Sequence, residues 1–85
     1  MIGLIQPRGL GDIVIALPIA RYFADMGQQV LWPIDRRFMT SLEPHVPYVE
    51  FLPFPFEDTL PNYADVPSAL LNARGCTRQI VHMRS

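Results

Sequence analysis

The chain opens with Ile2-Gly3-Leu4-Ile5-Gln6 and turns through Pro7-Arg8-Gly9-Leu10-Gly11-Asp12 into a second apolar stretch that starts at Ile13. This pattern predicts a buried parallel strand, a tight glycine-containing loop, and a helix with Asp12 in its first turn. Gly9 and Gly11 are expected where the backbone turns sharply. In open α/β sheets, ligands bind above the carboxyl ends of the strands, where free N–H groups at a helix start also point. The turn is therefore the predicted functional region.

The rest of the chain continues this alternation of strands and helices. We expect the first helix over residues 12–26 with Gly27 as its left-handed cap, a strand over 29–35, a short helix over 36–42 stopped by Pro44, and a strand over 48–52. A proline-rich loop, a helix over 66–74 and a strand over 79–83 follow. The alternation predicts an α/β protein with a partial Rossmann-like parallel sheet of about four strands and flanking helices.

Two prolines interrupt this regular pattern. Pro18 lies inside the first helix and is expected to kink it, because proline removes one backbone hydrogen bond. Pro33 lies inside the second strand, so either regular pairing fails near the end of that strand or the strand lies toward an edge. Helical spacing predicts that one face of the first helix packs on the sheet; its residues are Ile13, Ala16, Leu17, Ile19, Ala20, Phe23 and Met26.

Composition narrows the class of protein. The 85 residues are enough for one small domain, and 49% are hydrophobic, which favours a folded core. The net charge of −1 provides no basic surface for nucleic acid. The single cysteine, Cys76, excludes an internal disulfide and fits a reducing compartment. No signal peptide or transmembrane segment is evident, so we expect a soluble cytoplasmic protein.

The alternating pattern stops shortly after the fourth expected strand. Parallel sheets are normally covered by helices on both faces. We therefore expect residues 1–85 to be an incomplete, amino-terminal Rossmann-like domain of a larger protein. An uncovered apolar surface would favour self-association.

A dinucleotide site is one interpretation of the glycine turn. Asp35 follows Gly11 by 24 positions (35 − 11), near the spacing expected of an acidic residue that binds a ribose. The fingerprint also needs a small residue three positions after the second glycine, and Val14 stands there. The match is therefore partial.

The stretch from Ile2 to Pro18 resembles the amino terminus of glycosyltransferase family 9, which contains the bacterial heptosyltransferases that build the lipopolysaccharide core. The features that carry the resemblance are an apolar strand, the turn Arg8-Gly9-Leu10-Gly11-Asp12, and the pair Leu17-Pro18 in the helix. The second expected strand, which ends at Asp35 and is followed by Arg36-Arg37-Phe38, is also similar to this family. The likeness covers roughly the first 40 residues.

The resemblance implies a GT-B glycosyltransferase whose amino-terminal domain holds a saccharide acceptor, while a second domain outside this chain holds the nucleotide-sugar donor. It implies that Asp12 is the general base and that transfer of a heptose-like sugar needs no metal or other cofactor. The expected substrate contacts are Arg8, Gly9, Leu10, Gly11 and Asp35, of which Arg8 is suited to pairing with an anionic acceptor.

Each of these residues also has a purely structural interpretation. Asp12 can stabilise the helix start, Asp35 can cap the helix that follows it, and Arg8 can be a solvated loop residue. The two histidines, His45 and His82, have no second ligand at metal-binding spacing. The alternative functions are a non-catalytic nucleotide- or sugar-binding module and an inactive remnant.

Overall fold

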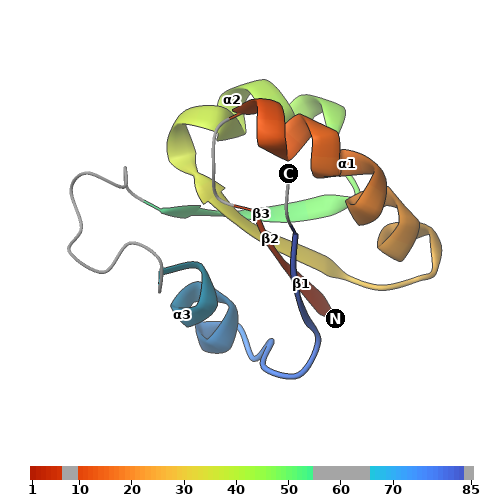
Figure 1. The fold of residues 1–85 in the computed structure, drawn as a ribbon, viewed down its shortest axis with the longest axis vertical. Coiled ribbons are helices and arrows are strands. Elements are labelled where there is room, and N and C mark those ends of the chain that lie inside the picture. The colour runs from red at the N-terminus through yellow and green to blue at the C-terminus, as the bar shows by residue number, and fades with distance from the viewer. Residues whose placement is uncertain (7–9, 55–65, 84–85) are drawn as a thin grey trace.

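Four parallel strands form one sheet with helices on both faces, as seen in a computed structural model that describes residues 1–6, 10–54 and 66–83 (Figure 1). The α/β class expected from the sequence is thereby confirmed. In chain order, the elements are β1 (Ile2–Ile5), α1 (Leu10–Asp25), β2 (Val30–Asp35), the 3-10 turn η1 (Arg36–Phe38), α2 (Met39–Leu42), the 3-10 turn η2 (Glu43–His45), β3 (Val49–Phe54), α3 (Val66–Ala73) and β4 (Ile80–His82).

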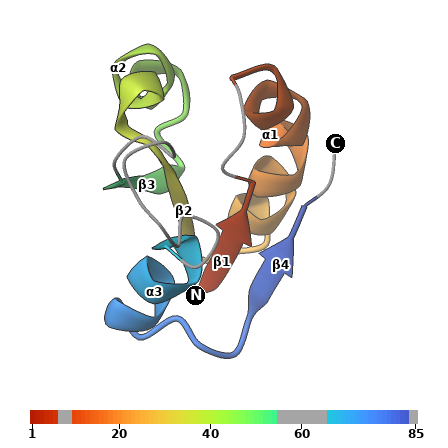
Figure 2. The same cartoon turned by 60° about the vertical axis from the view of Figure 1, so that its left-hand side comes forward.

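The strands lie in the order β3-β2-β1-β4 across the sheet (Figure 2). The chain first moves outward from β1 through β2 to β3, and then returns to place β4 on the other side of β1. Because parallel crossovers are right-handed, this reversal requires that α3 cover the face opposite to α1 and α2. Figure 1 shows α1 and α2 on one side of the sheet and α3 on the other.

Alternating strand residues divide the core into two layers. On one face of β2, the alternate residues Val30, Trp32 and Ile34 pack toward α1 and α2. On the other face of the sheet, Leu31 and Leu52 pack toward Leu71 of α3. This period of two is the expected pattern for a parallel sheet buried on both faces. The buried residues of the first layer are Ile2, Leu4, Ile13, Ala16, Ala20, Val30, Trp32, Ile34, Leu42, Val46, Val49, Phe51 and Met83.

Gly3 allows α3 to approach the sheet closely. A Cβ atom at Gly3 would lie 2.7 Å from Cδ1 and 2.9 Å from Cδ2 of Leu71, and 3.1 Å from Sγ of Cys76. Real Cβ atoms essentially never come within 3.0 Å of another heavy atom in this way. Because Gly3 has only a hydrogen atom in place of Cβ, the Leu71 side chain can occupy this space.

Two glycines end α1 and α3 in the same way. Gly27 has φ +85° and Gly75 has φ +83°, so both adopt the left-handed conformation expected of a helix cap. The N–H of Gln28 bonds to the carbonyl of Phe23, and the N–H of Cys76 bonds to that of Leu71. These six-residue bonds are those of the Schellman motif.

The first helix differs from the sequence expectation in two respects. It begins at Leu10, two residues before the expected start, so Gly11 is a helical residue without a positive φ rather than a turn residue. Ile19 and Met26, expected on the buried face, are exposed. The helix continues through Pro18, which lies on its exposed side.

The other differences concern Pro33 and Pro44. The strand β2 lies inside the sheet, so the edge position considered for Pro33 is wrong. Pairing of β2 with β1 covers only Val30 and Leu31, whereas pairing with β3 continues through Pro33 to Asp35. The helix α2 ends at Leu42, as expected, but a further 3-10 turn that contains Pro44, η2, follows it directly. The proline-rich loop lies outside the described residues, apart from its first residues, which extend β3 to Phe54.

Candidate functional site

The candidate site lies at the carboxyl ends of β1 and β4. Strands are added on one side of β1 as far as β3, and β4 is then added on the other side, so the order of the strands reverses between β1 and β4. Ile5 pairs with His82, and the N–H of Met83 donates to the carbonyl of Ile5 at 2.9 Å. The two strands therefore end side by side. In open α/β sheets, the crevice outside such a reversal is the usual place for a ligand.

Gln6 connects these two strand ends. Its side chain is buried directly after β1, and its Nε2 atom lies 3.5 Å from the carbonyl oxygen of Met83, to which it donates a weak hydrogen bond. A buried polar side chain needs such a partner, because leaving it unpaired costs free energy. Gln6 is not among the site residues predicted from the sequence, although a polar residue directly after an apolar strand is a signal for such a role.

Asp12 lies in the first turn of α1 and is half-buried. The next residue, Ile13, is fully buried in the core and anchors this turn against the sheet. Before it, Leu10 and Gly11 are exposed, and a Cβ atom at Gly11 would meet nothing within 4 Å. The start of α1 is therefore fixed on its inner side and open on its outer side. Arg8 and Gly9, two of the expected substrate contacts, lie outside the described residues.

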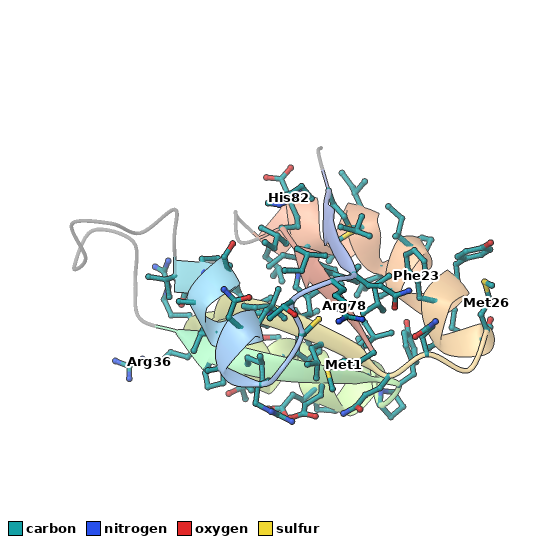
Figure 3. All side chains as sticks on the ribbon, turned by 90° about the horizontal axis from the view of Figure 1, so that it is seen from below. Met1, Phe23, Met26, Arg36, Arg78 and His82 are labelled. Atoms are coloured by element: carbon teal, nitrogen blue, oxygen red, sulfur yellow. The ribbon has the colours of Figure 1, made fainter. Side chains whose placement is uncertain are left out.

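His82 is an exposed residue at the same edge of the sheet. It ends β4 opposite Ile5, and Figure 3 shows it at the end of the molecule where α1 begins. In the sequence, this histidine has no second ligand at metal-binding spacing, and nothing else marked it as a site residue. The strand pairing places this imidazole beside the end of β1, near the start of α1.

Asp35 ends β2 at this edge and is buried. Its Oδ1 atom accepts a hydrogen bond from the backbone N–H of Arg37 at 2.9 Å, and Oδ2 accepts bonds from Nε at 3.0 Å and from a terminal guanidinium nitrogen at 2.7 Å. Asp35 therefore caps η1, as the structural interpretation predicts. A direct contact between Asp35 and a substrate stays a prediction.

The environment of Asp35 favours the ionised carboxylate. Burial by itself raises the pKa of Asp35, but the hydrogen bonds from Arg37 and the positive charges of Arg37 and Arg36 lower it further than burial raises it. The pKa of this carboxyl is therefore held below its usual value. Both carboxylate oxygens of Asp35 are hydrogen-bonded to Arg37, so the carboxylate is less available to a ligand.

Two further residues discussed from the sequence, His45 and Cys76, lie away from this candidate site. His45 lies in η2, and the buried thiol of Cys76 lies 3.7 Å from the carbonyl oxygen of Gln79. Within residues 1–6, 10–54 and 66–83, no group of three His, Cys, Asp or Glu side chains is arranged to hold a metal ion. An open hollow of about 520 Å³ is lined in part by Met1 and Arg78. Figure 3 shows these two residues at the opposite end of the strands from His82.

Comparison of the chain with protein-family models, with curated proteins and with solved structures gave no match. Among the helices in the described part of the chain, none has the length and apolar character needed to cross a bilayer.

Proposed function

We propose that this chain forms the acceptor-side, Rossmann-like domain of a GT-B glycosyltransferase in the cytoplasm. The enzyme would transfer a heptose-like sugar from a nucleotide-sugar donor to a saccharide acceptor. The donor would bind to a second domain that is not part of these residues. Asp12 would act as the general base in this reaction.

The observation that carries the proposal is the position of β1, the strand that precedes α1, in the strand order. The order β3-β2-β1-β4 coincides with the first four strands of the doubly wound order 3-2-1-4-5-6. The start of α1, which carries Leu10, Gly11 and Asp12 of the family-like motif, therefore follows the strand at the reversal point, which supports a ligand site there. This placement comes from the topology and is independent of the sequence resemblance.

The chemistry assigned to Asp12 follows from its place in the first turn of α1. Its carboxylate would accept the proton of an acceptor hydroxyl as the hydroxyl oxygen forms a bond to the anomeric carbon of the donor. The bond from that carbon to the donor phosphate would break, and the nucleotide would leave with the electron pair. The half-buried position of Asp12, directly after the exposed residues Leu10 and Gly11, suits a base that meets an acceptor entering from solvent.

The bonding of Asp35 weakens the alternative of a dinucleotide-binding module. A ribose-binding carboxylate needs oxygens that are free for the sugar hydroxyls. Both oxygens of Asp35 already accept hydrogen bonds from Arg37. A nucleotide at this edge would have to replace or share these bonds.

Ligand binding to the isotope-labelled chain separates the two functions. We expect phosphorylated monosaccharides to shift the amide NMR signals of Gly11, Asp12 and His82, and we expect nucleotides and nucleotide sugars to bind only weakly. Tight binding of a nucleotide, with shifts around Asp35, would support the binding module instead. The amide signals of Thr77 and Arg78 serve as the control. These residues lie at the opposite edge of the sheet, where β4 begins, so their signals should not shift.

The catalytic role of Asp12 needs a separate measurement. Sugar transfer is assayed after the chain is combined with a donor-binding domain, using the Asp12→Asn and Asp12→Ala variants. We expect transfer to fall by about 10²–10⁴-fold in both variants, the usual contribution of a general base. Unchanged transfer in a variant that still binds the acceptor would remove Asp12 from the mechanism.

A further inference from the structure

The outer face of α1 carries a stripe of large apolar side chains that continues one residue beyond the helix, here called the α1 stripe; its members are Ile15, Ile19 and Tyr22 on α1 and Met26 directly after its end. Its four members keep much of their surface in solvent: Ile15 is 70% exposed, Ile19 41%, Tyr22 60% and Met26 63%. A different face of the helix, rotated by roughly 120° from the stripe, buries Ile13, Ala16 and Ala20 against the sheet. The α1 stripe is therefore separate from the core.

The spacing of the α1 stripe is that of a helix–helix seam. Its members follow one another at intervals of four, three and four residues, which is the repeat of the core positions in a coiled coil. A narrow stripe of this kind fits a single partner helix, whereas a helix that packs on a sheet has a broader apolar face. The α1 stripe thus has the shape expected of a surface that meets one other helix.

We propose that the partner is a second copy of this chain, whose α1 helix lies antiparallel on the first. The interval pattern four-three-four reads the same in both directions. In an antiparallel pair centred between Ile19 and Tyr22, Ile15 meets Met26 of the second copy and Ile19 meets Tyr22. Every member of the stripe then contacts an apolar residue, which is the self-complementarity that a two-fold interface requires.

The charges beside the α1 stripe favour this partner over a lipid surface. Arg21 bonds to Asp25 at 3.1 Å and also lies over the ring of Tyr48, so its charge is already partnered within the chain. The remaining charge on α1 is Asp12, which is negative. Membrane-surface helices instead carry several lysines or arginines beside their apolar face.

The available area indicates how strong the association is. The four side chains together expose on the order of 400 Å², if a large side chain presents roughly 150–250 Å² when fully exposed. Two copies would bury about twice this area, below the roughly 1,200–2,000 Å² of stable interfaces. With the flanking surface of α1 included, the dimer falls into the weak, transient class, and we expect dissociation constants of micromolar order or weaker.

Sedimentation equilibrium of the wild-type chain and of two variants tests the surface. Tyr22→Lys places a charge at the centre of the α1 stripe and should weaken dimerisation by about 10–100-fold. Val14→Lys is the matched control, because Val14 is 49% exposed on the same helix but is rotated by roughly 100° from Ile15. It should change dimerisation less than about threefold. A wild-type chain that stays monomeric up to millimolar concentration overturns the proposal, as does equal weakening by both variants.

Cysteine cross-linking tests the antiparallel register. A mixture of the Ile15→Cys and Met26→Cys variants should form a disulfide-linked dimer of the two different chains under mild oxidation, whereas each variant alone should cross-link poorly. The natural Cys76 is buried and does not compete. Fluorescence of the buried Trp32 verifies that each variant is folded. Efficient cross-linking of Ile15→Cys with itself would show a parallel arrangement and reject the register. The outcome is independent of the role of Asp12.

Discussion

Asp35 and Arg37 form a closed ring of interactions at the end of β2. The carboxylate accepts one bond from the backbone and two from the guanidinium group of Arg37, at 2.7–3.0 Å. This arrangement allows β2 to pass directly into η1 with no intervening loop residue. The side chain of Asp35 is buried while that of Arg37 is half-exposed, so the pair holds the junction of strand and turn against the sheet.

Replacing Asp35 by Ala should lower the free energy of unfolding by about 1–3 kcal/mol, because one cap bond and two charge-assisted bonds are lost. Asp35→Asn should cost less, because the amide oxygen can still accept the backbone N–H of Arg37. Urea unfolding at pH 7, followed by the fluorescence of Trp32, measures both changes. Equal stability of all three proteins would contradict the assigned cap.

The same pair predicts a pH dependence. Since the pKa of Asp35 is lower in the folded chain than in the unfolded chain, the ionised carboxylate stabilises the fold above its usual pKa of about 3.9. That contribution is lost as the pH falls below this value through the pKa of the folded state. The difference in stability between wild type and Asp35→Asn should therefore shrink from pH 5 to lower pH. A difference that stays constant down to pH 2 would reject this explanation.

Gly3→Ala should destabilise the chain by about 1–3 kcal/mol, because the added methyl group overlaps the Leu71 side chain. The matched control is Gly11→Ala. Gly11 is helical and has open space around it, so alanine there should stabilise the chain by about 0.4–1 kcal/mol. Thermal unfolding compares the two variants, and opposite signs are expected.

A second substitution can verify the cause of the Gly3 effect. In the background of Leu71→Ala, the space beside Gly3 is empty and Gly3→Ala should cost much less than in wild type. This non-additivity is expected of residues in direct contact. Additive effects of the two substitutions would mean that Gly3 acts through the backbone and not through Leu71.

The left-handed cap of α3 predicts a graded response at Gly75. Gly75→Ala should cost about 1–2 kcal/mol, because a residue with a Cβ is strained at φ +83°. Gly75→Asn should cost less, since asparagine tolerates this conformation better than alanine. Unfolding midpoints in urea provide the comparison. An alanine variant as stable as wild type would contradict the assigned conformation.

Pro18→Ala should stabilise the chain by about 1–2 kcal/mol. Alanine restores the backbone N–H inside α1 and avoids the penalty of proline in a helix, which exceeds the gain that proline makes by restricting the unfolded chain. Pro18 is exposed, so little core packing is lost with its ring. Circular dichroism and thermal unfolding measure the effect. A less stable variant would show that the proline ring has a packing role.

Several parts of the fold could be predicted from local sequence alone. The glycine after α1, Gly27, marked the end of that helix, because only glycine enters the left-handed region without strain. The apolar runs indicated buried parallel strands, since both faces of such strands are covered. The capping role of the acid at the end of β2 is also predictable from the sequence, because an aspartate that precedes a helical turn commonly bonds to its N–H groups.

Tertiary structure decided the rest. Local spacing cannot tell which apolar side of α1 meets the sheet, and the helix turned Ile13 inward while leaving Ile19 and Met26 in solvent. Nor can it show that β4 inserts beside β1, a pairing that joins residues almost 80 positions apart, such as Ile5 and His82. That pairing brings Gln6, His82 and the start of α1 to one edge of the sheet. Short-range preferences act within a few residues and therefore specified each element, whereas the neighbours of each element depended on the burial of apolar surface by the whole chain.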